Sequence, residues 1–329
     1  MEKVMKHRNL GTSGPLVSAI GLGCAGMSEF YSATDNIDQQ AGIKLIQQAY
    51  ELGITFFDTA DVYGRGHNEI LVGQAIQHFR DKIIVATKCG FERNGDDWRI
   101  DNSSEFIKKA CNASLQRLGI QTIDLYYLHR HDPSMPIENV MHTMLELINE
   151  NKIRYVGLSE VDAQTIERAH AVLGDKLVAV QSEYSIINHE DAERVLPICR
   201  KLGISFVAYS PLMKGLLSGT LRDTKIFQTS EKSDCRLEMP QFAPDNLPYN
   251  LKLVDALQTL AFKKNCTTAQ LSLAWLLAQG DDIIPIPGTS ILKYLKENID
   301  SVNIHLTDND LNTIKSIMQE NPIKGIREA

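Results

Sequence analysis

The sequence predicts an α/β fold in which eight parallel strands alternate with helices and close into a (β/α)8 barrel of the TIM type. Eight apolar runs alternate with amphipathic stretches at a spacing of roughly 25–40 residues, which favours a closed barrel over an open sheet. The runs are continuously apolar, as in strands that are buried on both faces. No change in composition marks a boundary along the chain, so we expect a single barrel domain over residues 1–329.

The segment before the first barrel strand predicts an N-terminal β-hairpin. Residues 7–22 contain short β-like pieces separated by Gly and Pro turn residues. Gly21–Gly26 then matches the G-x-G-x-x-G pattern of dinucleotide-binding turns. That pattern binds a dinucleotide only where a helix follows at once, and here the polar segment Met27–Asn36 follows instead. We therefore interpret it as a tight turn at the end of a strand, which disfavours a Rossmann-type dehydrogenase.

The other strands and helices follow from the apolar pattern, taken in chain order. Strands are predicted at Ala19–Leu22, Ile54–Phe57, Ile83–Thr87, Ile123–Leu128, Ile153–Leu158, Leu177–Gln181, Ile204–Ala208 and Ile283–Ile286. Helices are predicted at Gln40–Leu52, Glu69–Phe79, a segment ending at Arg117, Ile137–Glu150, Ala163–Leu173, Asp191–Leu202 and Ala269–Ala278.

Capping residues set several of the predicted helix ends. Asn102, followed three places later by Glu105, is typical of a helix start, and Gly119 of a helix end. Thr267-Thr268-Ala269-Gln270 resembles a capping box. Thr307-Asp308-Asn309-Asp310 predicts a capped helix in a C-terminal helix and loop extension. The interval Lys214–Leu247 is too long for a plain connection, so we expect a functional lid or a disordered loop there.

Composition excludes several classes of partner. The formal net charge of −7 argues against nucleic acid and against an anionic membrane surface. The N-terminus has no apolar signal segment, and no apolar run reaches the length of a membrane span. The six cysteines are scattered without a C-x-x-C pair, which is typical of reduced thiols and predicts a cytoplasmic protein.

Four ionisable side chains follow three of the predicted strands. Asp58 ends the strand at 54–57 and Tyr63 follows it, Lys88 ends the strand at 83–87, and His129 ends the strand at 123–128. The carboxyl ends of parallel barrel strands meet at one mouth, where such barrels carry out catalysis. Each residue alone has an ordinary explanation as a turn cap, a half-buried aromatic or a solvated charge. Together they predict a shared pocket, and we call Asp58, Tyr63, Lys88 and His129 the quartet.

The quartet has the composition of an acid–base device. A phenol has a pKa near 10 and is a poor proton donor to a carbonyl. An ammonium about 4 Å away, worth roughly 4 kcal/mol, lowers that pKa by up to about three units before the opposing desolvation cost. Lys88 suits this task, Asp58 can keep the ammonium charged, and His129 can donate to the substrate oxygen. The group contains no nucleophile, no metal cage and no hydride source, so a hydride has to come from a cofactor.

A metal site is the competing interpretation. His129-Arg130-His131-Asp132 contains an H-x-H at a strand end. A metal site needs further His or carboxylate ligands on other strand ends, whereas the remaining histidines fall mostly in helices or turns. We therefore expect no metal.

The chain resembles the aldo-keto reductase superfamily over nearly its whole length. The resemblance is carried by Phe57-Asp58-Thr59-Ala60-Asp61-Val62-Tyr63-Gly64, by Thr87-Lys88 and by Tyr127-Leu128-His129. It implies a (β/α)8 barrel and a metal-free, NADPH-dependent interconversion of carbonyls and alcohols. It also implies that Tyr63 is the proton donor, with Asp58, Lys88 and His129 as its partners.

The resemblance also assigns the cofactor contacts. Ser159 and Gln181 match the residues that hold the nicotinamide amide, and Tyr209 matches the aromatic that stacks on the nicotinamide. The phosphate loop is matched by Ser210, Leu212, Lys214 and Gly215. The 2′-phosphate site is matched by Gly288, Thr289 and Ser290, and the adenine contacts by Glu297 and Asn298. This chain has Glu160 where the family usually has Asn. It also has Ile291 and Tyr294 in the turn where tight binders of the 2′-phosphate carry Lys or Arg. Lys293 is the nearby cation that could bind the 2′-phosphate. We therefore expect NADP(H) as the cofactor, with NAD(H) possible.

Two functions follow from this. The first is reduction of small aldehydes or ketones to alcohols, or the reverse, with a small-molecule carbonyl or alcohol as partner. The second is a cofactor-binding regulatory subunit similar to potassium-channel β subunits, which the short N-terminus disfavours. Expected pocket walls are Phe30, Tyr31, Trp98, His131 and the Lys214–Leu247 loop, which indicate a small or flat substrate. No particular substrate, direction or oligomeric state is predicted.

Overall fold

An eight-stranded parallel sheet forms the centre of this computed structural model, which describes residues 5–28, 39–94, 97–225 and 234–325. The strand order is β3-β4-β5-β8-β9-β10-β11-β12. The strands are β3 (Leu22–Gly23), β4 (Phe56–Asp58), β5 (Ile84–Cys89), β8 (Ile123–Leu128), β9 (Ile153–Ser159), β10 (Leu177–Glu183), β11 (Ser205–Tyr209) and β12 (Ile283–Pro285). A parallel bridge between Gly23 and Gly288 links the first strand to the chain beyond the last. The predicted (β/α)8 barrel is confirmed.

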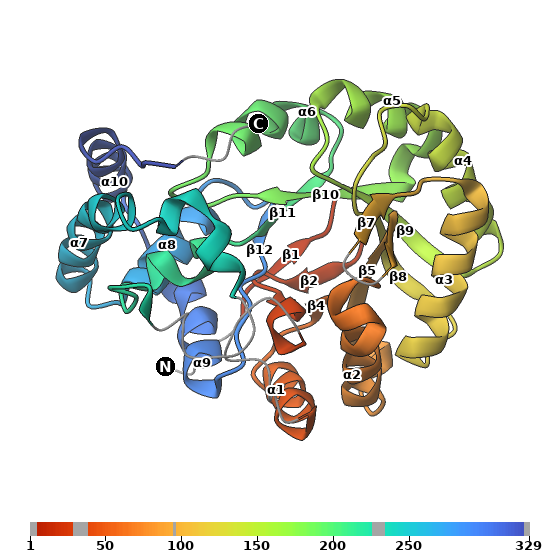
Figure 1. The fold of residues 1–329 in the computed structure, drawn as a ribbon, viewed down its shortest axis with the longest axis horizontal. Helices are drawn as coiled ribbons and strands as arrows, with labels where there is room; N and C mark the ends of the chain where they lie inside the picture. Colours follow the sequence, from red (N-terminus) through yellow and green to blue (C-terminus); the bar gives the residue numbers. More distant parts are fainter. Residues whose placement is uncertain (1–4, 29–38, 95–96, 226–233, 326–329) are drawn as a thin grey trace.

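The helices surround the strands as a ring (Figure 1). They are α1 (Gln39–Glu51), α2 (His67–Ile76), α3 (Ser104–Leu118), α4 (Ile137–Asn149), α5 (Ala163–Leu173), α6 (Glu190–Lys201), α7 (Leu247–Lys263), α8 (Thr268–Leu277), α9 (Leu292–Asp300) and α10 (Asp308–Glu320). Two capping boxes act as predicted, because the Thr267 and Thr307 side chains accept from the backbone N–H groups of Gln270 and Asp310, whose side chains accept in turn from the threonine N–H groups. Within the described residues, no helix is both long and apolar enough to cross a membrane.

The barrel has two apolar cores because side chains alternate between the faces of each strand. Residues such as Phe57 and Val85 face outward and pack against the helices. Their neighbours Phe56 and Ala86 face inward and form a smaller core inside the barrel, together with Leu125. The same alternation decides which polar side chains at the strand ends point into the mouth.

An N-terminal hairpin adds to the inner core, as predicted. Strands β1 (His7–Asn9) and β2 (Leu16–Ser18) pair antiparallel, and they lie near the centre of the view in Figure 1. Leu10 and Val17 belong to the apolar cluster inside the barrel. The Arg8 guanidinium donates to the carbonyls of Leu277, at the end of α8, and Gly280, in the loop before β12, which fixes the hairpin to the last helix–strand connection.

Most predicted boundaries lie within two residues of those observed, and three predictions need correction. The first barrel strand is β3 at Leu22–Gly23 rather than Ala19–Leu22. Helix α2 ends at Ile76 rather than Phe79. The N-cap of α3 is Ser103 rather than Asn102, because the Ser103 side chain accepts from the Phe106 N–H.

Four elements have no counterpart in the predicted series. Helices α7 and α9 were not predicted, and neither was the antiparallel hairpin of β6 (Phe91–Asn94) and β7 (Asp97–Ile100). The expected lid at Lys214–Leu247 contains short 3-10 helices at Met213–Ser218, Cys235–Glu238 and Pro240–Phe242. Its central part, 226–233, lies outside the described residues, so its role as a lid stays a prediction.

Candidate active site

Strand alternation places three members of the quartet in the mouth of the barrel. Asp58 is two residues beyond the inward-facing Phe56, and Lys88 is two residues beyond the inward-facing Ala86. Both lie inside their strands rather than after them. His129 directly follows β8, and its backbone N–H donates to the carbonyl of Cys89 at the end of β5. The carboxyl ends of three neighbouring strands therefore supply one group of polar side chains.

Lys88 is the centre of this group. Its side chain is fully buried, and its Nζ donates to Asp58 Oδ1 at 2.5 Å and to the Thr59 carbonyl at 2.8 Å. The third contact of Nζ is the Tyr63 hydroxyl, at 3.5 Å. Burial acts most strongly on Lys88 and opposes its charge, but Asp58 and Tyr63 together raise the pKa of the ammonium. Lys88 is therefore a cation at neutral pH.

A tight turn after β4 brings Tyr63 to the same place. Tyr63 begins a 3-10 turn in which Gly64 and Arg65 have φ values of 55°, the left-handed region that favours glycine. A side chain at position 64 would also meet the Cβ of Ser28 at 2.9 Å. The Tyr63 ring stands edge-on to the His129 ring, with centroids 6.0 Å apart and planes at 85°. The structure thus brings all four members of the quartet together.

Burial and the Lys88 ammonium act in opposite directions on the pKa of Tyr63. Burial raises the pKa of the phenol, and this outweighs the opposing effects of Lys88 and Arg130. Lys88 lowers the pKa as expected, but desolvation of a phenolate costs more free energy than one nearby ammonium provides, so the net direction is upward. Tyr63 is a protonated phenol at neutral pH, which is the form that donates a proton.

His129 is held neutral. Burial, followed by the positive charges of Lys88 and Arg130, lowers the pKa of His129 well below its ordinary value of 6.5. Its Nδ1 is buried and has no hydrogen-bond partner among the described residues. A buried N–H without an acceptor is rarer than a buried acceptor without a donor, so we place the proton on Nε2. Nε2 is not among the buried unpartnered atoms, so it is open to a ligand.

The neutral state of His129 predicts a pH-dependent stability. As pH falls through about 6.5, the unfolded chain gains a proton on this imidazole and the folded chain does not, so the free energy of unfolding decreases. Below about pH 6.5, this proton uptake lowers the free energy of unfolding by up to about 1.4 kcal/mol per pH unit. We expect His129→Gln to lack this contribution. Urea unfolding of both proteins between neutral and mildly acid pH measures it. Identical pH slopes for the two proteins would contradict the assignment of a neutral His129.

The predicted nicotinamide contacts also lie on the interior face of the barrel. Ser159 and Gln181 are 1% and 3% exposed at the ends of β9 and β10, and Tyr209 ends β11, half-buried against the inner core. Gln181 Nε2 donates to Asp58 Oδ2 at 2.8 Å. Gln181 therefore joins the predicted cofactor residues to the quartet, a bond that the sequence did not predict.

The predicted phosphate loop follows β11 and has an unusual backbone. Ser210, Met213 and Lys214 have φ values of 46°, 46° and 49° although none of them is glycine, and Gly215 follows at 96°. Such conformations are strained and gather at ligand sites. The Lys214 carbonyl accepts from Arg236, whose guanidinium pairs with Asp234 at 2.7 Å. Sequence reasoning missed Arg236, because it lies in the long interval without a strand or helix pattern.

The predicted adenine-end residues lie around the start of α9. Thr289 Oγ1 accepts from the Ile291 N–H, and Lys293 is exposed with its Nζ 5.8 Å from the Tyr294 ring centroid. Glu297 accepts from the Thr267 hydroxyl of α8. Of the other residues predicted for this end, Gly288 and Ser290 are exposed and Asn298 is buried, and Leu212 of the predicted phosphate loop is half-buried.

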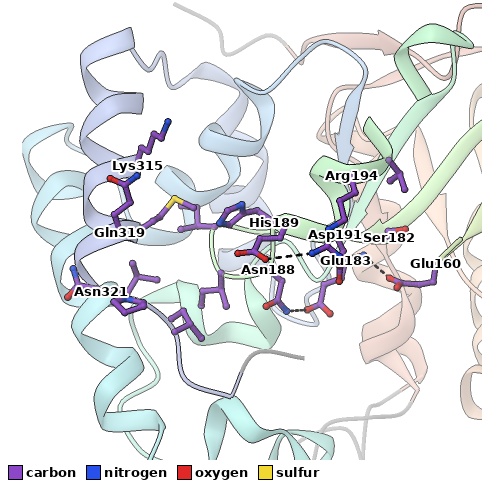
Figure 2. Close-up of a pocket in the computed structure, with 18 of the residues that line it drawn as sticks. Glu160, Ser182, Glu183, Asn188, His189, Asp191, Arg194, Lys315, Gln319 and Asn321 are labelled. Atoms are coloured by element: carbon purple, nitrogen blue, oxygen red, sulfur yellow. Dashed lines mark hydrogen bonds and ion pairs between the residues drawn. The ribbon is translucent and has the colours of Figure 1, made fainter. Parts of the chain in front are cut away.

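A second pocket, of about 960 Å³, lies beside the mouth between the loops after β9 and β10 and the C-terminal helix α10 (Figure 2). No member of the quartet lines it. Glu160 does, and its carboxylate accepts from the Glu183 N–H at 2.9 Å. Glu160 thus turns toward this outer pocket, whereas Ser159 before it faces the barrel interior. Glu160, at the position where the family usually has Asn, therefore lines a different pocket from the quartet.

The hairpin β6–β7 forms a wall beside the quartet. Phe91 stands edge-on to His129 with centroids 5.1 Å apart, and it contacts Trp98, which is 42% exposed. The His131 Nε2 is bonded to the Met135 carbonyl at 2.9 Å. Of the predicted pocket walls, Phe30 and Tyr31 lie outside the described residues. In the part of the chain that the structure describes, no group of three His, Cys, Asp or Glu side chains could hold a metal ion.

Comparisons with known proteins agree with this geometry. The model of the aldo/keto reductase family matches residues 19–319. A probable aldo-keto reductase 1 of Glycine max is 41% identical over 320 residues, which is 97% of this chain and 90% of that protein. The glycerol dehydrogenase of Gluconobacter oxydans has a TM-score of 0.85 at 27% identity, with 98% of this chain and 99% of that one covered. An aldo-keto reductase of Bacillus halodurans, solved in its holo form, has a TM-score of 0.78 at 28% identity, over 95% and 96% of the two chains.

Proposed function

Because the chain belongs to the aldo/keto reductase family and is thus an oxidoreductase that acts on carbonyls, we propose that it reduces small aldehydes or ketones with NADPH, using Tyr63 as proton donor. One observation carries the proposal. The buried Lys88 ammonium lies 2.5 Å from Asp58 and 3.5 Å from the Tyr63 hydroxyl, at the carboxyl end of the barrel. This places the phenol beside a fixed positive charge, which stabilises the phenolate left after proton transfer.

The residues of the chain fit a nicotinamide cofactor. Ser159 and Gln181 present buried polar side chains toward the barrel interior, and Tyr209 offers a ring at the end of the next strand. The strained turn at 210–215 supplies backbone dipoles of the kind that bind phosphate. When bound, the cofactor supplies the hydride.

Each member of the quartet then has a separate task. The His129 Nε2 donates to the carbonyl oxygen and orients it, and Tyr63 transfers its proton to the same oxygen as negative charge develops there. Lys88 stabilises the resulting phenolate, and Asp58 keeps Lys88 charged and aimed. Because the chain supplies no nucleophile in the quartet, no covalent intermediate with the protein is needed.

The test is to assay a panel of aldehydes and ketones with NADPH and with NADH. Turnover is measured as the loss of absorbance of the reduced nicotinamide. The proposal expects turnover of reactive aldehydes with at least one of the two cofactors. NADPH binding without turnover of any carbonyl would instead indicate a cofactor-binding regulatory protein.

The preference for NADPH rests on one exposed cation. We expect Lys293→Ala to weaken NADPH binding about 5- to 10-fold and NADH binding hardly at all, because only NADPH carries the 2′-phosphate. Lys296→Ala, an exposed lysine of the same helix, is the matched control. Dissociation constants of both nucleotides, measured by fluorescence titration, decide this. An equal loss for the two nucleotides removes Lys293 from the phosphate site.

A further inference from the structure

Arg130 is a half-buried arginine beside the quartet that pairs with no carboxylate of the described chain. It directly follows His129, and its Nη1 donates to the His129 carbonyl at 2.6 Å and to Ser159 Oγ at 3.1 Å. Arginines removed from water normally meet a carboxylate or a phosphate. Among the described residues Arg130 has neutral oxygens only as partners, so its charge has no counterpart in that part of the chain.

One edge of the Arg130 guanidinium is open. Both hydrogen bonds use Nη1, and neither Nε nor Nη2 is among the buried polar atoms that lack a partner, so these atoms are reached by solvent. The Nε and Nη2 hydrogens are parallel, which is the arrangement that holds a carboxylate through two bonds. The two bonds of Nη1 fix the guanidinium beside His129, on the side of the predicted nicotinamide contact Ser159.

The surroundings are cationic, although the chain as a whole is acidic. The Arg130 charge reaches both Tyr63 and His129, since it lowers the pKa of each. Next to the turn that carries Tyr63, Arg93 of the β6–β7 hairpin donates to the Val62 carbonyl and lies over the Trp98 ring at 4.6 Å. The one carboxylate in contact with the quartet's lysine, Asp58, is already bonded to Lys88 and Gln181.

From this geometry we propose that Arg130 determines specificity by binding a carboxylate on the substrate, so that the preferred substrates are aldehydes or ketones that carry a carboxylate group. The proposal rests on the reductase function proposed above and narrows its substrate class. The open edge of Arg130 receives the carboxylate, while the carbonyl oxygen meets Tyr63 and His129.

The experiment compares two isosteric sets of substrates, the ortho, meta and para isomers of carboxybenzaldehyde and of nitrobenzaldehyde. Both groups are planar and withdraw electrons, but only the carboxylate is charged. For at least one isomer we expect Arg130→Met to lower the ratio of kcat/KM for carboxyl over nitro about 10- to 100-fold, the effect of losing a charge-assisted hydrogen-bond pair. Arg130→Lys keeps the charge without the planar fork, so the ratio should fall less, by about 3- to 10-fold.

Direct binding separates this proposal from the reductase function. Titration of benzoate into the NADPH complex should give a dissociation constant about 10- to 100-fold higher in Arg130→Met. If benzoate binding depends on Arg130 while no aldehyde is turned over, the carboxylate site holds and the reductase function fails. An unchanged carboxyl-to-nitro ratio in Arg130→Met would overturn the proposal. An equal fall in kcat/KM for the carboxyl and the nitro substrates, together with weaker NADPH binding, would also overturn it. Arg130 would then act only by positioning Ser159.

Discussion

Replacing Tyr63 by Phe is expected to lower kcat for carbonyl reduction about 100- to 10,000-fold, the range for loss of a general acid. Of the quartet, only Tyr63 combines a protonated hydroxyl at neutral pH with contact to the Lys88 ammonium. His129 is a poor substitute, since it is neutral and its imidazole N–H is a far weaker acid than an imidazolium.

The variant should keep its fold and its cofactor, because the ring remains and only one oxygen is removed. NADPH affinity is therefore expected to change less than about threefold, within the range of a lost neutral hydrogen bond. Tyr126→Phe is the matched control: it removes the hydroxyl of a fully buried tyrosine that faces the helices rather than the mouth. Single-turnover rates with saturating NADPH measure the effect. Turnover of Tyr63→Phe within a few-fold of the parent protein would remove the proton-donor role.

The quartet could be predicted from the sequence because its members lie at strand ends and because side chains along a strand alternate between the two faces. Asp58 and Lys88 each follow an inward-facing residue by two places, so any correct strand assignment puts them in the same mouth. The pKa of Tyr63 could not be predicted in the same way. Its direction depends on how much water the turn at 63–66 excludes, and a sequence pattern does not record that.

Of the elements that were missed, the β6–β7 hairpin lacks a periodic apolar pattern, whereas α7 and α9 have one, at Leu253, Leu257 and Leu260 and at Leu292, Leu295 and Ile299. All four residues of β7 are exposed, so the hairpin carrying Phe91 and Trp98 has no buried face to detect. Helix α7 directly follows the long irregular interval, where no capping side chain marks its start. Arg130 was overlooked because His129-Arg130-His131 was considered for its two histidines, whereas the structure ties His131 to a backbone carbonyl and leaves the arginine with an open edge.

Replacing Lys88 by Met should have the second large effect, on stability as well as on activity. The variant leaves the 3%-exposed Asp58 carboxylate without its cation, and breaking a buried ion pair on one side costs about 3–5 kcal/mol. The free energy of unfolding from urea titration should fall by that amount. The proton-transfer step should be lost as well, because Tyr63 would face Asp58 without an intervening positive charge.

A double variant separates these two effects. In Asp58→Asn with Lys88→Met no buried charge is left unpaired, and an amide at position 58 can still accept from Gln181. Stability should therefore recover by about 2 kcal/mol or more relative to Lys88→Met alone. Activity should not recover, because the Tyr63 phenolate still has no cation to stabilise it. Additive losses in the double-mutant cycle would contradict a coupled buried pair, and restored turnover in the double variant would show that the protein does not need Lys88 to activate Tyr63.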